Sequence, residues 1–223
     1  MLDVPFYQSH LDRVSRSFAF CIRELPAPLR GWVSLSYLMC RVLDTVEDAR
    51  WCDAATRAQA YERFDDFLRA APTTAALSAW RDSFPASLPP GERALLADAA
   101  RFFHDLATLD HGPRQAILET VRSMSAGMQH YAAQHAALGE LRLGDIKEVN
   151  RYCYFVAGIV GLLLTRLFVQ HRPSYTPPEG LLKDAFHFGI FLQKINILKD
   201  QSDDEAEGRF LVPSRHTVLL SLV

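Results

Sequence analysis

The amino-acid sequence predicts an all-α protein, folded as a single-domain helical bundle. Apolar residues recur at spacings of three and four, and alternating runs of β-branched residues are few. Prolines and glycines cut the chain into pieces of helical length, which by these rules form roughly seven or eight helices. The 223 residues suffice for one sizeable core and 49% of them are apolar, so we expect one domain over residues 1–223.

Breaker residues mark the expected ends of the helices, and capping residues mark two expected starts. The breaks are expected at Pro26 with Pro28, at Pro72, and at residues 85–92, 111–113, 143–145 and 172–180. Thr176 as N-cap, Pro177 at the first helical position and Glu179 at the third match a capping box, which predicts a helix from Pro177 onward. Asp145 with Glu148 resembles the same box and predicts a helix start after Asp145.

The most apolar segment, residues 152–168, is expected to be a central helix of the bundle, because it is apolar on every side. Arg166 limits its uncharged run to about fourteen residues, whereas a membrane span needs roughly twenty, so we expect no transmembrane helix. Ala157, Gly158 and Gly161 remove side-chain bulk from this helix, which lets either a neighbouring helix or a ligand approach its backbone.

Charge and cysteine content exclude several classes of partner. A formal charge of −2 and a pI of about 6.4 provide no basic field for nucleic acid or for an anionic membrane, so any anionic ligand must be held by particular residues. The four cysteines lack the spacing of a metal site or a disulfide frame, which indicates buried thiols in a reducing, cytoplasmic compartment. The first twenty residues have neither a basic segment nor a long apolar core, so we expect no signal peptide.

Polar residues form one stripe along the helix predicted for YLMCRVLDTVEDA, residues 37–49. Tyr37, Arg41, Asp44 and Asp48 are four, three and four positions apart, which places them on one helix face. In one interpretation this is an exposed stripe in which Arg41 and Asp44 form an ordinary ion pair. In the other interpretation it is part of a functional site.

A second stripe repeats the pattern in FLQKINILKDQSDDEAEGR, residues 191–209. Gln193, Asn196, Asp200 and Asp204 are three, four and four positions apart. Two aspartate pairs facing each other across a bundle would repel unless cations lay between them, and such oxygen ligands favour Mg²⁺ or Mn²⁺. Because Mg²⁺ commonly joins carboxylates to phosphates, a diphosphate ligand follows. The alternative is a solvated acidic helix end.

Four blocks of the sequence together resemble the squalene and phytoene synthase family, the head-to-head prenyl transferases. The blocks are SRSFAF at 15–20, YLMCRVLDTVED at 37–48, YCYFVAGIVGLLLTRLF at 152–168 and FLQKINILKDQSDDEAEGRFLVP at 191–213, with lesser matches FFHDL at 102–106 and MSAGM at 124–128. The resemblance covers most of residues 10–213 and is closer to the squalene synthase branch. It implies a bundle of the isoprenoid (terpenoid) synthase type with a central apolar cavity.

The resemblance implies a metal site and a diphosphate site. The metal ligands for Mg²⁺ or Mn²⁺ would be Asp44, Asp48, Asp200 and Asp204, with Asp203 in support. The groups that contact diphosphate oxygens would be Ser15, Arg16, Ser17 and Arg41. An arginine fork suits this task, and surface ion pairing is the competing interpretation for these arginines.

The resemblance also implies catalytic and channel residues. Tyr152 matches the tyrosine linked in the family to proton removal, and Tyr37 lies next to the metal site; a core tyrosine is the competing interpretation for both. The apolar channel would be lined by Phe18, Val156, Val160, Leu164, Phe188, Gly189 and Leu192. The remaining substrate-binding residues of the second motif would be Gln193, Asn196 and Lys199. Lys199 replaces the arginine usual at that position, and a lysine offers a point charge in place of a fork.

The implied reaction explains why acids would lie at the edge of an apolar bundle. Mg²⁺ neutralises a diphosphate so that it can leave, and the resulting allylic carbocation needs a dry, apolar channel. Two farnesyl diphosphates would couple to presqualene diphosphate, which rearranges to squalene and accepts hydride from NADPH. Since the sequence has no G-x-G-x-x-G fingerprint, NADPH is implied by the resemblance alone. The expected partners are prenyl diphosphates, and peripheral membrane association would release the apolar product; substrate length and oligomeric state are left open.

Two alternatives stay open. Without hydride transfer, the product would be presqualene diphosphate, hydroxysqualene, dehydrosqualene or phytoene. The family normally continues through several more helices after GRFLVP, whereas SRHTVLLSLV, residues 214–223, does not resemble them. The chain is therefore expected to lack the last helices of the family, and the alternative of another class is a truncated, inactive protein that binds prenyl diphosphates or a partner through its uncovered apolar face.

Overall fold

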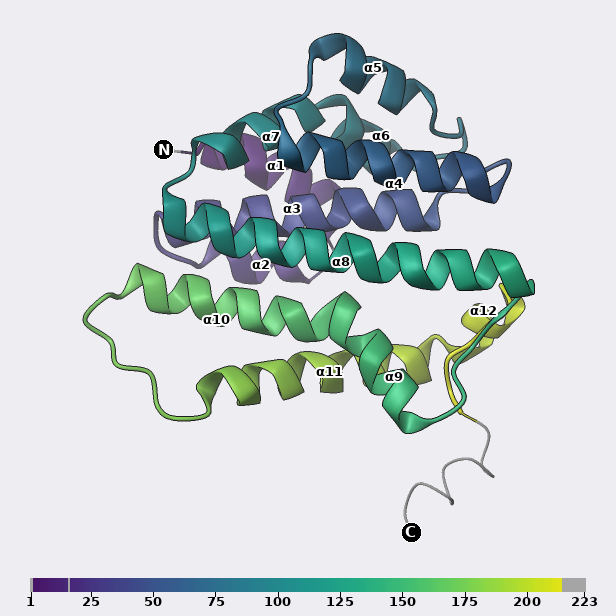
Figure 1. Cartoon of the computed structure of the whole chain (residues 1–223). Coiled ribbons are helices and arrows are strands. Elements are labelled where there is room, and N and C mark those ends of the chain that lie inside the picture. The colour runs from purple at the N-terminus through teal and green to yellow at the C-terminus, as the bar shows by residue number, and fades with distance from the viewer. Residues whose placement is uncertain (1, 16, 214–223) are drawn as a thin grey trace. The chain divides into compact units, whose positions relative to one another are not determined.

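The all-α prediction is confirmed by a computed structural model, which describes residues 2–15 and 17–213. Over these residues the chain forms twelve α-helices, one π-helical segment and two short strands (Figure 1). The α-helices are α1 (Val4–Val14), α2 (Phe18–Arg23), α3 (Leu29–Asp48), α4 (Ala54–Arg69), α5 (Thr74–Asp82), α6 (Pro90–Ala97), α7 (Ala99–Thr108), α8 (His111–Leu138), α9 (Ile146–Cys153), α10 (Ile159–His171), α11 (Leu181–Lys199) and α12 (Gln201–Ala206). The π-helical segment η1 is Tyr154–Gly158, and the strands β1 (Leu141–Arg142) and β2 (Arg209–Phe210) pair in parallel.

The helices are more numerous and shorter than expected. Three short helices, α5, α6 and α7, fill the stretch between α4 and α8. The break expected at residues 111–113 is instead the start of α8, because a proline in the first helical turn removes no hydrogen bond that the helix could otherwise make. The number of helices was therefore underestimated where breakers lie inside first turns or between very short helices.

The chain divides into two compact units. The first comprises Met1–Ser125 with Arg166–Thr176, and the second comprises Ala126–Thr165 with Pro177–Val223. The boundaries fall inside α8 and α10, so both helices contribute residues to each unit. The expectation of one domain over the whole chain stays a prediction.

Helix α3 is central to the first unit, where it contacts α1, α2, α4, α6 and α7. Figure 1 shows α4 running alongside it. Leu35, Leu38, Met39 and Leu43 of α3 are completely buried. Burial of such a side chain contributes about 1.5–3 kcal/mol, so these residues fix the position and rotation of α3 in its unit.

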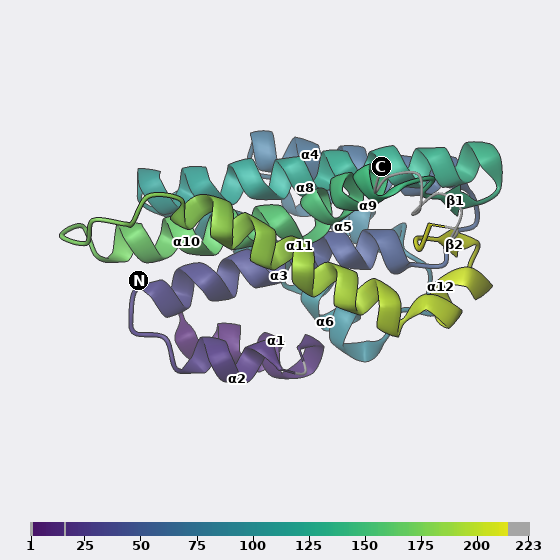
Figure 2. The same cartoon turned by 90° about the horizontal axis from the view of Figure 1, so that it is seen from below.

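The second unit is built on the contact between η1 and α11. Its core is a cluster of buried residues: Tyr131, Leu141, Leu143, Val149, Tyr152, Cys153, Ile190, Ile197 and Leu211. The two strands join this cluster, because Leu141 N donates to Gly208 O at 2.9 Å and Leu143 N donates to Phe210 O at 3.0 Å. Figure 2 shows α11 leading into α12 at its C-terminal end.

Glycines allow η1 and α10 to pack closely on α11. A Cβ atom on Gly189 would lie 2.6 Å from Ala157 O, and one on Gly158 would lie 3.2 Å from Ile190 Cγ1. A Cβ atom on Gly161 would collide with Ala185 O. Of the two uses considered for these small residues, the structure therefore supports the approach of a neighbouring helix.

The helical run that contains the apolar segment 152–168 is longer than that segment. Among the described residues, Ile146–His171 forms a helical run of 26 residues whose most apolar 18-residue window has a mean hydropathy of 1.9, which is long and apolar enough to cross a membrane by length and composition. The argument that the segment is too short to span is therefore wrong. The run is weak support for a span, since core helices pass the same test and 33% of its most apolar window is buried.

The two predicted capping boxes have different outcomes. Asp145 caps α9, because its side chain accepts from Lys147 N at 2.8 Å and Glu148 N at 2.9 Å. The box at Thr176 is wrong: α11 begins at Leu181, after Gly180 with a φ of 86°. The reason is Pro178, since a proline pushes the residue before it out of the α region and so prevents Pro177 from opening a helix.

We predict that Gly189→Ala destabilises the chain by about 1–3 kcal/mol, because the new methyl would meet the Ala157 carbonyl oxygen, which is backbone and cannot turn away. In an open helix the same change would stabilise by up to about 1 kcal/mol. Gly112→Ala on α8 is the matched control, because its nearest neighbour is the flexible Gln170 side chain. Urea unfolding of both variants measures the difference, and equal stability of Gly189→Ala and wild type would contradict the close packing.

Candidate active site

The first polar stripe lies on the least buried face of α3. Tyr37, Arg41 and Asp44 are half-buried and Asp48 is exposed, whereas the intervening Val42, Leu43, Thr45 and Val46 are buried. The spacing therefore gave the correct face. The acids do not enter the apolar core of the unit but lie along its edge.

Arg41 lies between two carboxylates. Its Nη1 is 3.6 Å from Asp44 Oδ2, and its Nη2 is in close contact with Glu92 Oε1 from α6. Burial alone would lower the pKa of Arg41, but Asp44, Glu92 and Asp48 together raise it, so the guanidinium stays charged. The Nε atom of Arg41 is buried and has no hydrogen-bond partner among the described residues.

Glu92 was missed by sequence reasoning. It lies at the end of residues 85–92, which the sequence marked only as a break between helices, yet it is the first-turn acid of α6 and is buried. No local pattern links it to Arg41, because the two residues are 51 positions apart.

Burial and nearby acids weaken the acidity of Asp44. The net effect raises its pKa to about 7: burial is the largest cause, Arg41 opposes it, and Asp48 and Glu92 act in the same direction as burial. The side chain still exposes 37% of its surface, so solvent at that edge moderates the effect of burial. Near neutral pH the carboxyl is thus poised between its protonated and its metal-binding form.

The SRSFAF block, residues 15–20, belongs to the same unit as α3. Ser15 Oγ accepts from Ala19 N in the first turn of α2 at 3.1 Å, while Ser17, the N-cap of α2, is exposed and makes no side-chain capping bond. Arg16 lies outside the described residues. The ring of Phe18 is 59% exposed and its centroid is 6.0 Å from that of Tyr37, which brings these two predicted site residues together.

The second motif is divided between two helices. The single helix expected through Asp204 is interrupted at Asp200, whose φ of −99° and ψ of 11° end α11 and precede α12. The i to i+4 bonds nevertheless continue, from Asp200 N to Asn196 O at 2.8 Å and from Asp204 N to Asp200 O at 3.0 Å. Asp200 and Asp204 therefore remain one turn apart.

The two acids of the second motif have different surroundings. Asp204 pairs with Arg209 at 2.8 Å, and burial raises its pKa although Arg209 opposes the shift. Asp200 is exposed and lies 3.8 Å from Lys199, and Asp203 is exposed as well. Arg209, which sequence reasoning also left out, is thus the basic partner of this motif.

The predicted channel and substrate-binding residues of the second unit, together with Tyr152, fall into three groups by burial. Tyr152 is buried, with its ring centroid 5.0 Å from that of Tyr131, and Gly189 is buried against Ala157. The half-buried residues are Val156, Val160, Leu164 and Gln193. The exposed residues are Phe188, Leu192, Asn196 and Lys199.

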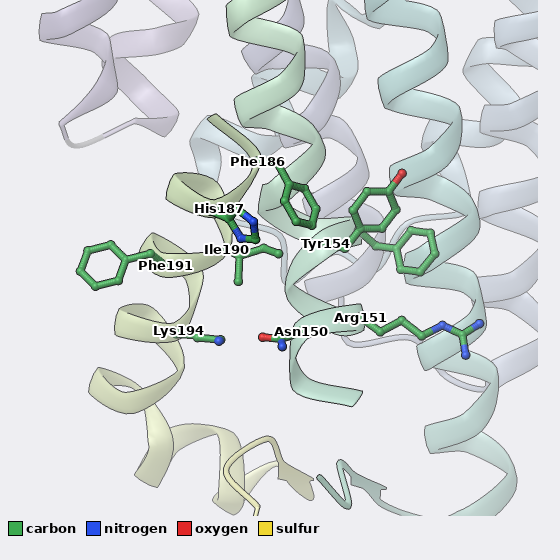
Figure 3. A pocket seen from close by; sticks show the side chains of 9 residues that line it. Asn150, Arg151, Tyr154, Phe186, His187, Ile190, Phe191 and Lys194 are labelled. Carbon is green, nitrogen blue, oxygen red and sulfur yellow. The ribbon is translucent and has the colours of Figure 1, made fainter. Parts of the chain in front are cut away.

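The second unit also contains a cavity of about 660 Å³ that the sequence did not predict. It is lined by Asn150, Arg151, Tyr154, Phe155, Phe186, His187, Ile190, Phe191 and Lys194. Figure 3 shows the side chains of Asn150 from α9 and Lys194 from α11 pointing toward each other. None of the predicted channel residues lines this cavity, so it is not the predicted channel.

The chemistry of the donors suits a magnesium ion. Among residues 2–15 and 17–213, no group of three or more His, Cys, Asp and Glu side chains could hold a metal ion by itself. Mg²⁺ needs fewer protein ligands, because it keeps several waters and is commonly held by one or two carboxylates and a substrate phosphate. Asp44 and Asp48, one turn apart on the open face of α3, fit that requirement. That the pair on α3 faces Asp200 and Asp204 stays a prediction.

Comparisons with known proteins agree on one family. The sequence profile of squalene/phytoene synthase matches residues 11–217. Squalene synthase of Mycosarcoma maydis is 34% identical over 206 residues, which are 92% of this chain and 34% of that protein. Squalene synthase of Schizosaccharomyces pombe is 32% identical over 207 residues, or 91% and 42% of the two chains. A solved complex of TcSQS with the ligand BPH1237 superposes with a TM-score of 0.73 at 28% identity, covering 94% of this chain and 57% of that one.

We predict that Asp44→Asn stabilises the metal-free protein at neutral and alkaline pH. Between the ordinary pKa of 3.8 and the folded-state pKa of about 7, the folded protein keeps a proton that the unfolded chain releases, so the free energy of unfolding falls as pH rises from 4 to 7. Asp44→Asn has no carboxyl at this position, so its free energy of unfolding does not fall for this reason between pH 4 and 7. Its Tm should exceed that of wild type by about 2–4 °C at pH 8 and match it at pH 4, in EDTA.

Thermal unfolding across this pH range tests the prediction. Asp66→Asn on α4 is the control, because Asp66 is 56% exposed and forms only a surface pair with Arg69. A variant at Asp44 that is no more stable than wild type at pH 8 would show that the carboxyl carries no burial penalty.

Proposed function

The chain belongs to the squalene/phytoene synthase family, and on that premise we propose that it acts in the Mg²⁺-dependent head-to-head condensation of two prenyl diphosphates. The proposed substrate is farnesyl diphosphate and the proposed product is squalene, formed through presqualene diphosphate with reduction by NADPH. The observation that carries the proposal is the family match over residues 11–217, together with two intact aspartate pairs. The chain spans 34% and 42% of the length of two curated relatives, so the complete reaction is a proposal for this chain.

The residues of the first unit have the chemistry to bind the diphosphate end of the substrate. A magnesium ion, when bound, supplies charge that stabilises the departing diphosphate. Asp44 and Asp48 would hold it on the open face of α3, and Arg41 would direct its fork to diphosphate oxygens. The adjacent rings of Phe18 and Tyr37 offer aromatic faces that steady a cation without attacking it.

The residues of the second unit have the chemistry to bind the hydrocarbon and the second diphosphate. Val156, Val160 and Leu164 repeat every four residues along η1 and α10 and offer apolar surface that excludes water. Asp200 and Asp204 would hold metal near the end of α11. For NADPH, residues 2–15 and 17–213 form no dinucleotide-binding fold and the sequence has no G-x-G-x-x-G fingerprint, so no residue is assigned to the cofactor.

Product analysis tests this function. The full chain is incubated with Mg²⁺ and farnesyl or geranylgeranyl diphosphate, with and without NADPH, and the hydrocarbons are extracted and identified. Squalene only with NADPH supports the complete proposal. Presqualene diphosphate, hydroxysqualene, dehydrosqualene or phytoene identifies a synthase without hydride transfer. A folded protein that forms no product under any condition supports the inactive, prenyl-diphosphate-binding alternative.

We further propose a cytoplasmic location with membrane association. Exposed apolar side chains gather on α11, among them Phe188, Phe191 and Leu198, which are 61%, 56% and 64% exposed. Such a surface suits either a lipid layer or a partner. Flotation with phosphatidylcholine vesicles tests the proposal, and a chain that stays entirely with the unbound fraction would contradict it.

We predict that Asp44→Asn or Asp48→Asn lowers turnover of farnesyl diphosphate by at least about 100-fold, because each removes a metal ligand whose charge acts in the transition state. Excess EDTA should abolish turnover, and added Mg²⁺ should restore it. Asp66→Asn is again the control, with turnover within about twofold of wild type. Full activity of Asp44→Asn or Asp48→Asn would show that the substituted aspartate is not a metal ligand.

A further inference from the structure

Arg41 lies closer to Glu92 than to Asp44. Its Nη2 is in hydrogen-bond contact with Glu92 Oε1, whereas its Nη1 is 3.6 Å from Asp44 Oδ2. Hydrogen bonds between charged groups are typically about 2.7–2.9 Å long, so the contact with Asp44 is longer than the usual charged hydrogen bond. The arginine thus hydrogen-bonds to Glu92, while its contact with the acid of its own helix is longer than a hydrogen bond.

Glu92 is held in a fixed position next to Arg41. Its side chain is only 10% exposed, compared with 26% for Arg41 and 37% for Asp44. The buried Leu95 and Leu96 fix α6, the helix that carries Glu92. Because a buried carboxylate that loses its partner is costly, the pair resists opening when ligands arrive at the exposed side.

Without Glu92, Arg41 would have Asp44 as its nearest acid. The two residues are three positions apart on one helix, which is the spacing at which side chains meet. A close arginine–carboxylate pair occupies the oxygens that a cation needs. Arg41 would then compete with the metal for the same carboxylate.

We propose that Glu92 is a positioning residue that holds Arg41 away from Asp44, so that the Asp44 carboxylate is available to a divalent cation. The inference rests on the proposed metal role of Asp44. The proposal adds a residue of α6 to the site, and this residue lies outside both aspartate motifs. It also gives the buried carboxylate of Glu92 a function beyond the stability of its unit.

Manganese binding tests the proposal without catalysis. Mn²⁺ is titrated into the full chain, and the unbound ion is measured by electron paramagnetic resonance. We expect Glu92→Gln to weaken Mn²⁺ binding by about threefold or more, a typical size for coupling between contacting residues. Glu92→Asp, which keeps the charge at shorter reach, should fall between Glu92→Gln and wild type.

The loss of a negative charge would by itself weaken cation binding, so Arg41 must be varied as well. If Glu92 acts through Arg41, Glu92→Gln should change Mn²⁺ affinity by less than about twofold in an Arg41→Gln background. An equal loss in both backgrounds, or no loss in wild-type background, would overturn the proposal. Glu119→Gln is the matched control, since Glu119 forms an exposed pair with Arg166 at 3.0 Å.

Two further measurements separate the possible failures. Far-UV circular dichroism and urea unfolding establish that each variant is folded, and Glu92→Asp serves if Glu92→Gln is not. If wild type binds no Mn²⁺, or binds it equally well after Asp44→Asn, the metal role of Asp44 fails and this inference fails with it. If wild type binds Mn²⁺ through Asp44 and Glu92→Gln binds equally well, only this inference fails.

Discussion

The first unit depends on the burial of three sides of α3. The completely buried Leu35, Leu38, Met39 and Leu43 fix the rotation of α3 about its axis. The residues on the remaining, less buried face are therefore held at the edge of the core. The sequence places an arginine and two aspartates on this face. Burial raises the pKa of Asp44 to about 7, with Asp48 and Glu92 acting in the same direction, whereas the acids Asp44, Glu92 and Asp48 keep Arg41 charged.

The second unit depends on a different constraint, the close approach of two helix backbones. A Cβ atom on Gly189 would collide with the Ala157 carbonyl oxygen, and one on Gly158 would lie 3.2 Å from Ile190 Cγ1, so the two backbones approach closely at these glycines. This contact fixes the start of the stretch that carries Asn196, Asp200 and Asp204. The close helix contact lies in the middle of α11 and the helix ends at Asp200, so the acids follow a helix that also exposes apolar side chains such as Phe191 and Leu198.

Local periodicity explains what the sequence could predict. Spacings of three and four identify the helices, the stripe from Tyr37 to Asp48 and the N-cap at Asp145, because each depends on residues within one or two turns. It could not predict Glu92, whose contact with Arg41 arises only when distant helices pack. Local periodicity also gave a wrong helix start at Thr176, because Pro178 prevents Pro177 from opening a helix. It missed the end of α11 at Asp200, because the polar spacing continues across the change of backbone angle there. The division into two units depends on long-range contacts that no single stretch reports.

The π-helical turn at Tyr154–Gly158 has a geometric consequence for the apolar surface around it. Residues four apart on a regular α-helix advance by about 40° beyond a full turn, so Tyr152, Val156, Val160 and Leu164 would spiral steadily off a common line. A wider turn rotates less per residue and cancels part of that drift. The local change of winding therefore straightens a row of side chains that a uniform helix would wrap around its axis, and a straight row is the shape that an extended hydrocarbon chain can follow.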